Sequence, residues 1–212
     1  MGQKYRAWSA VVAVVVLAAA LQSASATTIA TFADPTIGTS PIVPVFTVGA
    51  GTISGGWTGT GLDLELADPP IPNTPTATTY IDVIFEFDPA VYVGTPTDGL
   101  VMGGQLRFYE RDNSQPGNKG AELLRVDFEQ AFLTRSAVGS DNIFSDNGVM
   151  FTAYGVPLDL EEESFAFSFA NQKLTPPSGY TATASFTSSA VPEPGTLLVL
   201  LGGLPLLMIR RR

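Results

Sequence analysis

The residues with the most specific chemistry form a short motif near the end of the chain. One carboxylate stands between two prolines in this motif, which consists of Val191, Pro192, Glu193, Pro194 and Gly195. Each proline fixes its own φ and biases the residue before it towards extended backbone. Because proteases bind exposed, extended peptide, the motif predicts a site of recognition and processing.

An uncharged run follows the motif, and a basic cluster ends the sequence. The run, Thr196–Ile209, contains 14 apolar or small residues, which span ~21 Å as a helix. A bilayer core is roughly 30 Å thick, and two glycines and a proline weaken the run further. The cluster Arg210, Arg211 and Arg212 predicts a cytoplasmic end, which places Glu193 on the opposite side. We therefore expect a transient anchor, and a permanent transmembrane helix is the alternative.

Together, the tripeptide, the apolar run and the terminal arginines resemble the PEP-CTERM sorting signal of Gram-negative bacteria. The resemblance is confined to this tail. It implies recognition by exosortase, a membrane protease and transpeptidase. It also implies association with the cell envelope or with an extracellular polysaccharide and biofilm matrix. It does not indicate what the rest of the chain binds.

Residues 1–26 have the composition of a secretory signal peptide. A basic start precedes the apolar run Ala10–Leu21, and the small residues Ala24 and Ala26 form a cleavage site of the A-x-A type. The run is too short for a transmembrane helix, which is the alternative. We expect a signal helix here, export by Sec-type machinery and cleavage by signal peptidase after Ala26. The mature chain then begins at Thr27.

The composition between the two ends excludes several classes of function. Residues 27–191 carry 19 Asp and Glu against 6 Lys and Arg, a net charge of −13. Such an acidic chain repels nucleic acid, so no nucleic-acid partner is expected. The chain has no histidine and no cysteine, which excludes Ser/His/Asp and Cys/His catalysis as well as disulfide bonds. Neither a Gly-x-Ser-x-Gly elbow nor a phosphate-binding loop is present in the sequence.

Apolar and polar residues alternate with period two in many segments, which is typical of half-buried strands. The clearest rows are Leu62–Leu66, Ile81–Phe87, Leu106–Phe108, Leu124–Phe128, Phe165–Phe169 and Tyr180–Phe186, with further strands at Val43–Val48 and Val149–Tyr154. Each strand must bury its apolar face against another sheet. We expect an all-β domain at 27–187, an antiparallel β-sandwich of jelly-roll type. The signal helix and a C-terminal hydrophobic helix at 196–209 flank it, and a stalk begins at Ser188.

Two groups of residues are candidate ligand sites in the expected domain. Asp141, Asn142, Asp146 and Asn147 offer hard oxygen ligands from loops, which suit Ca²⁺. They lack the spacing of a calcium-binding EF-hand loop, and ordinary Asx turns are the alternative. Apart from calcium, no cofactor is expected. Trp57 lies in a glycine-rich segment, and its ring is a candidate for stacking on a sugar; a core or edge aromatic at a bulge is the alternative.

The sequence is consistent with three functions. A non-catalytic surface or matrix protein accounts for both ends of the chain: it is exported across the inner membrane, transiently anchored, and then released to the cell surface or the matrix. A carbohydrate-binding module is the alternative, with extracellular polysaccharide as its partner. A secreted glycan-active enzyme needs two carboxylates, and the candidates are Glu86, Glu110, Asp127 and Glu129. Alternation places Glu86, Asp127 and Glu129 on polar faces, where solvated carboxylates are normal, so we expect no enzymatic activity.

Overall fold

Antiparallel strands make up almost all of the domain. The computed structural model of the protein describes residues 27–36, 43–67, 77–140, 148–158, 160–176 and 179–192. Within these ranges there are fifteen strands, all paired antiparallel, and one short 3₁₀ turn, η1 (Pro116–Asn118). The prediction of an all-β, antiparallel domain is confirmed. The expected signal helix and C-terminal helix lie outside the described residues.

The strands differ widely in length, from two residues to 16. In chain order they are β1 (Thr27–Phe32), β2 (Phe46–Val48), β3 (Thr52–Trp57), β4 (Leu64–Ala67), β5 (Ala77–Tyr80), β6 (Ile84–Thr95), β7 (Asp98–Val101), β8 (Gly104–Arg111), β9 (Lys119–Phe128), β10 (Ala131–Thr134), β11 (Ala137–Ser140), β12 (Met150–Ala153), β13 (Val156–Pro157), β14 (Leu160–Thr175) and β15 (Gly179–Pro192).

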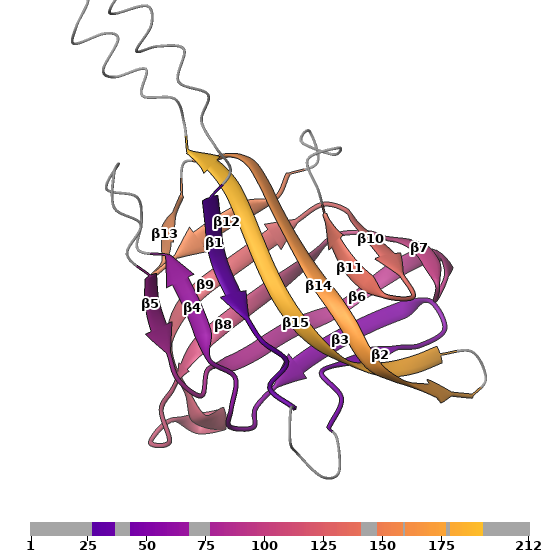
Figure 1. Cartoon of the computed structure of the whole chain (residues 1–212), viewed down its shortest axis with the longest axis horizontal. Helices are drawn as coiled ribbons and strands as arrows, with labels where there is room; N and C mark the ends of the chain where they lie inside the picture. The colour runs from indigo at the N-terminus through magenta and orange to yellow at the C-terminus, as the bar shows by residue number, and fades with distance from the viewer. Residues whose placement is uncertain are drawn as a thin grey trace, which may run out of the picture.

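The strands form one continuous sheet that closes on itself (Figure 1). Eight of them make a ring in the order β6-β7-β10-β11-β14-β15-β2-β3, and β3 pairs with β6 to complete it. Two arms extend from this ring. One arm continues from β6 through β8, β9, β12 and β13, and the other continues from β15 through β1, β4 and β5. Strands β6 and β15 therefore belong both to the ring and to an arm.

A jelly-roll sandwich predicts two separate sheets, whereas the structure has a closed eight-strand barrel with two arms. The cause is the length of the strands, because β6 has 12 residues, β14 has 16 and β15 has 14. A strand of that length can pair with one neighbour along its first half and another along its second. Strand β6 does this with β8 and then with β7. Hydrogen bonding therefore continues around the edge of the molecule.

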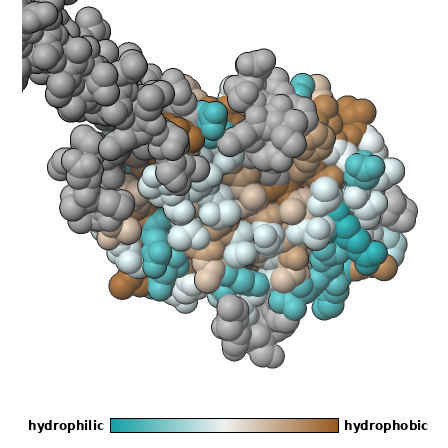
Figure 2. All heavy atoms as spheres, turned by 45° about the horizontal axis from the view of Figure 1, so that its top comes forward, coloured by the Kyte–Doolittle hydropathy of each residue, from teal (hydrophilic) through white to brown (hydrophobic). Residues whose placement is uncertain are grey.

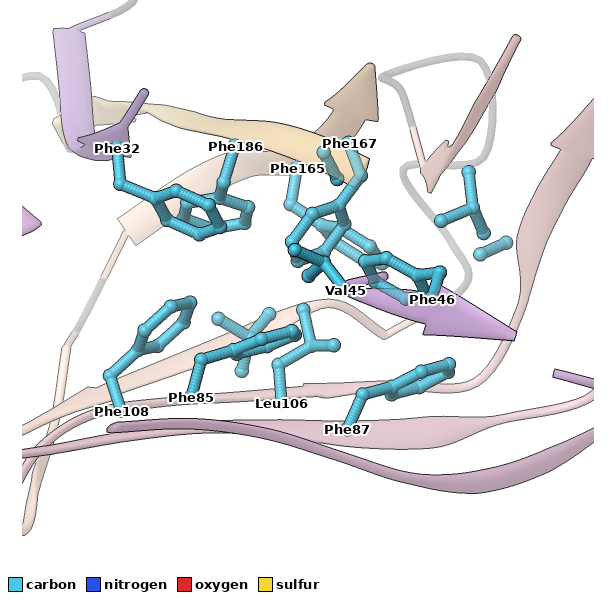
Figure 3. Close-up of a cluster of buried hydrophobic side chains, with 14 of the residues drawn as sticks. Phe32, Val45, Phe46, Phe85, Phe87, Leu106, Phe108, Phe165, Phe167 and Phe186 are labelled. Atoms are coloured by element: carbon cyan, nitrogen blue, oxygen red, sulfur yellow. The ribbon is translucent and has the colours of Figure 1, made fainter. Parts of the chain in front are cut away.

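Phenylalanine rings fill the space between opposite walls of the sheet (Figure 3). The ring centroid of Phe167 lies 4.9 Å from that of Phe46, 5.4 Å from that of Phe85 and 4.8 Å from that of Phe186. All four side chains are buried. Aromatic pairs in tilted or edge-to-face geometry add to the free energy gained from burying apolar area. The predicted inward rows of phenylalanines on β6 and β14 are confirmed.

Two predicted boundaries differ from the structure. Ile81 does not share the buried face of Phe85 and is 71% exposed. The reason is the backbone of Asp82, whose φ of 55° interrupts the alternation before β6 begins at Ile84. At the other end of the domain, β15 continues to Pro192, past the expected domain end at 187. At Ile81 the backbone bends, although the apolar pattern continues. After residue 187 the strand continues, although the alternation of apolar and polar residues has ended.

Phe167→Ala should destabilise the fold by about 3–5 kcal/mol, because it leaves a cavity among the rings that contact Phe167. Leu174→Ala lies on the same strand at a position that is 81% exposed. It should change the free energy of unfolding by less than about 0.5 kcal/mol. Urea denaturation followed by tryptophan fluorescence measures both effects. Equal effects of the two substitutions would contradict the placement of Phe167 in the core.

Candidate functional site

The expected sorting motif begins inside the sheet. The last two residues of β15 pair with β14, where Val191 lies opposite Glu161 and Pro192 lies opposite Leu160. The rest of the site predicted at the chain ends lies outside the described residues: Glu193, Pro194, Gly195, Arg210, Arg211, Arg212, and Ala24 and Ala26 of the signal cleavage site. The structure therefore places the start of the motif at the end of a strand.

The stalk expected from Ser188 onwards is strand up to Pro192. Ser188 and Ala190 are 1% and 0% exposed, and β15 lies between β14 and β1 at these positions. Small residues such as Ser188 and Ala190 are common in flexible segments, so the composition predicts a stalk here. In a strand, however, alternate residues point to the same face, and here Ser188 and Ala190 take the inward positions. The domain therefore includes residues that the composition assigns to the stalk.

Both ends of the described domain lie at one end of the barrel, which we name the terminal pole: Thr27–Thr28, Leu160–Glu163 and Ser189–Pro192. Thr27, at which the mature chain is expected to begin, lies opposite Ala190. The start of β1 and the end of β15 are side by side in Figure 1. The two targeting segments expected from the sequence therefore adjoin neighbouring strands.

A buried serine joins β15 to β1 next to the terminal pole. The Ser188 hydroxyl accepts a hydrogen bond from the Ala30 N–H at 3.0 Å and donates one to the Ala30 carbonyl at 3.2 Å. The register of the two strands shifts between Thr28 and Ala30, and such a bulge leaves backbone groups without a ladder partner. Leaving buried backbone groups unpaired is costly. We name this pair of bonds the serine clamp, because it satisfies both backbone groups of Ala30.

A second bulge interrupts β14 beside the start of the motif. Its register with β15 shifts between Glu161 and Ser164, and Glu162 has a positive φ of 49°. The carboxylate of Glu163, in this bulge, accepts a hydrogen bond from the Phe151 N–H of β12 at 3.1 Å. Burial raises the pKa of Glu163 to about 7, although the bond from Phe151 opposes the rise. This carboxyl group therefore titrates near neutral pH.

Trp57 lies at the end of β3 and is only 6% exposed. Its indole Nε1–H donates a hydrogen bond to the Thr60 carbonyl at 3.2 Å. The chain passes so close to the ring that a Cβ on Gly59 would lie 2.9 Å from it. Little of the ring is available for a sugar to stack on. The position fits the alternative of a buried aromatic at a strand end.

Two of the candidate catalytic carboxylates form ion pairs on the outer face of the sheet. Lys119 Nζ contacts Glu86, Arg125 Nε donates to Asp127 at 2.9 Å, and Gln105 also donates to Asp127. All of these side chains are partly exposed. The alternation predicts that Glu86 and Asp127 lie on polar faces. It does not predict the ion pairs, because these depend on the register between β6, β8 and β9.

A shallow hollow of about 270 Å³ lies over β10, β11, β14 and β15. Its lining is apolar or carries hydroxyl groups, which come from Thr134, Ser164, Thr187, Ser188 and Ser189. Figure 2 shows pale and brown residues, weakly polar and hydrophobic, mixed across the middle of the face that it displays. General acid–base catalysis needs a titratable group next to the bound substrate. The residues that line the hollow include no such group.

Glu163→Gln should remove part of the pH dependence of stability. The fold raises the pKa of Glu163 from 4.5 to about 7, so its contribution is fully present below pH 4.5 and is lost as the pH rises through 7. The variant should match the wild type near pH 4.5. At about pH 8 its free energy of unfolding should be higher by on the order of 1 kcal/mol, a value reduced for partial exposure. Urea denaturation at the two pH values measures the difference.

Glu162→Gln is the matched control, because Glu162 is the exposed neighbour in the same bulge. It should show no comparable difference between the two pH values. A gain from Glu163→Gln that is equal at both pH values would contradict the raised pKa of Glu163.

The predicted calcium ligands Asp141, Asn142, Asp146 and Asn147 lie outside the described residues. Across the ranges that are described, no three acidic side chains gather as a metal site would need. The same ranges contain no helix long and apolar enough to cross a membrane. No family model, no curated protein and no solved structure matches the chain.

Proposed function

We propose that this chain is an exported, non-catalytic protein of the cell surface or extracellular matrix, sorted and processed by an exosortase-like membrane enzyme. The observation that carries the proposal is the order of the tail: the Pro-Glu-Pro motif, the apolar run and the three arginines. The terminal pole supports it, because β15 brings the start of the motif to the surface beside the start of β1. The mature protein then lacks both targeting segments.

The tail leaves little distance between the folded domain and a membrane. Pro192 is the last residue of β15, and Thr196 is the first residue of the apolar run. The chain between them reaches at most about 14 Å when it is fully extended. A bilayer that holds the apolar run therefore keeps the terminal pole close to the lipid headgroups and to an enzyme embedded there. Cleavage in this segment separates the domain from its anchor and leaves β15 in the sheet.

The polar groups of the described domain support a non-catalytic role. Glu86 and Asp127 have cationic neighbours on an open sheet face. Glu163 has the pKa of a general acid or base, but its carboxylate is bonded to the Phe151 N–H within a strand bulge. We therefore give Glu163 a structural role at the terminal pole, as the hydrogen-bond acceptor for the Phe151 N–H. The lack of histidine and cysteine in the whole chain agrees with this assignment.

Carbohydrate binding is the second candidate function, and the hollow over β14 and β15 favours it. Its lining carries no charged side chain, which suits a neutral glycan such as an extracellular polysaccharide. The Ser188 hydroxyl is already bonded to Ala30. Trp57 does not supply a stacking platform for this role, because its ring is buried. The two functions are compatible, since a glycan-binding domain can also be the domain that the tail directs to the surface.

For the architecture we propose a flattened barrel, whose two walls pack as the layers of a sandwich do. The rings of Phe32 and Phe186 from β1 and β15 face those of Phe85 and Phe108 from β6 and β8 (Figure 3). The centroids of Phe32 and Phe85 are 6.1 Å apart, and those of Phe108 and Phe186 are 5.2 Å apart. Direct contact between side chains of opposite walls supports a packed, two-layered interior.

Glu193→Gln should prevent processing, because it removes the only charge from the motif that the enzyme recognises. The full-length chain is expressed in a Gram-negative host with an exosortase and in the same host without one. Wild-type protein should leave the membrane fraction only in the first host, and the variant should stay in the membrane fraction in both. Immunoblots of the fractions measure the distribution.

Glu162→Gln is the control for loss of a carboxylate at the terminal pole, and it should behave as the wild type. Retention of the wild-type protein and its tail in the membrane fraction of both hosts would contradict the proposed function.

A further inference from the structure

Part of the expected sorting motif takes part in the sheet, so its backbone groups that face β14 are not available to a peptide-binding cleft. Val191 and Pro192 pair with Glu161 and Leu160 of β14. A cleft that binds extended peptide forms main-chain hydrogen bonds of its own with the segment. The same backbone groups cannot bond to β14 and to a cleft at once. A cleft that bonds to the groups facing β14, or that encloses the segment from both edges, therefore requires the end of β15 to leave β14.

The bulge in β14 separates these last pairs from the rest of the ladder. Between Ser164 and Ala170 the pairing of β14 with β15 is unbroken, whereas the register shifts between Glu161 and Ser164. Pro192 has no N–H to donate to the last pair. On the other side of β15, the pairing with β1 extends only to Ala190 in the described part of the chain. A strand end with so few partners opens more readily than the ladder inside the barrel.

Side chains immediately before this end resist opening. The serine clamp joins Ser188 to Ala30 by bonds of 3.0 and 3.2 Å. The hydroxyl oxygens of Ser189 and Ser164 lie 2.9 Å apart. Ala190 is fully buried and belongs to the core cluster. The boundary between the end that opens and the strand that stays fixed therefore falls at Ala190.

We propose that Val191 and Pro192 form an end zip with Glu161 and Leu160, and that this zip opens to admit the sorting motif to the membrane enzyme. The serine clamp keeps the remainder of β15 in the barrel while the zip is open. The proposal rests on the proposed function and describes how the motif reaches its partner, an enzyme cleft that takes extended peptide. Opening lengthens the accessible segment without unfolding the domain.

A cross-strand disulfide tests the end zip, because the chain has no cysteine of its own. The full-length Glu161→Cys/Val191→Cys variant joins opposite residues, at a separation that a disulfide spans. It is incubated with membranes from a host that has an exosortase, with and without a thiol reductant. The oxidised variant should be processed about tenfold more slowly than the reduced variant. Mass spectrometry of the products measures the rates.

The matched control is Ser168→Cys/Ser185→Cys, which joins opposite residues of the same two strands inside the unbroken ladder. Its rate of processing should not depend on the reductant. Val191→Cys alone measures the effect of replacing a motif residue. Equal rates for oxidised and reduced Glu161→Cys/Val191→Cys would overturn the proposal. Equal slowing by the control disulfide would also overturn it, because opening would then extend beyond the end of β15.

Ser188→Ala provides a second test, which does not depend on forming a disulfide. Without the serine clamp more of β15 can open, so processing should be about threefold faster than in the wild type. A rate equal to or below that of the wild type would contradict the role of the clamp. If the wild-type chain is not processed at all, the proposed function fails, and this result is distinct from a failure of the end zip.

Discussion

The rest of the structure depends on the pairing of β14 with β15. Strand β15 pairs with β14 along its whole length, from Gly179 to Pro192, and also with β1 and β2. The eight-strand ring, one arm and both ends of the domain therefore meet on a single strand. Phe167 and Phe186 lie opposite each other in this pair, and their rings are central to the aromatic core. Sheet closure and core packing thus share the same two strands.

Two strand bulges, one in β1 and one in β14, lie at or next to the terminal pole. At each bulge a side chain forms hydrogen bonds with backbone groups. In the bulge of β1 the N–H and carbonyl of Ala30 bond to the Ser188 hydroxyl. The bulge of β14 carries Glu163, whose carboxylate accepts a hydrogen bond from the Phe151 N–H of β12. A bulge disrupts regular pairing locally, and the bulge of β14 lies next to the start of the expected motif. A hollow of about 270 Å³ over β10, β11, β14 and β15 is lined by apolar and hydroxyl-bearing residues.

Period-two alternation is sufficient to predict the strand class and the inward rows of phenylalanines, because both depend only on neighbouring residues. It does not predict which strands pair, so the closed ring and the ion pairs of Glu86 and Asp127 could not be derived from it. The burial of two residues is mispredicted from their type. Ile81 is apolar but exposed, because the positive φ of Asp82 interrupts the alternation. Ser188 is polar but buried, and its hydroxyl bonds to the backbone of Ala30. The Pro-Glu-Pro tripeptide is a feature of the sequence alone, whereas the inclusion of Val191 and Pro192 in β15 depends on pairing with distant residues.

The central claim is that the domain is released from its tail after the motif has been recognised at the terminal pole. The mass of the intact protein isolated from the surface or matrix of an exosortase-containing host tests this claim most directly. The account predicts a chain that begins at Thr27, retains β15 and lacks the apolar run and Arg210–Arg212. Recovery of surface protein with the complete tail, including Arg212, would contradict it and would identify the tail as a permanent anchor.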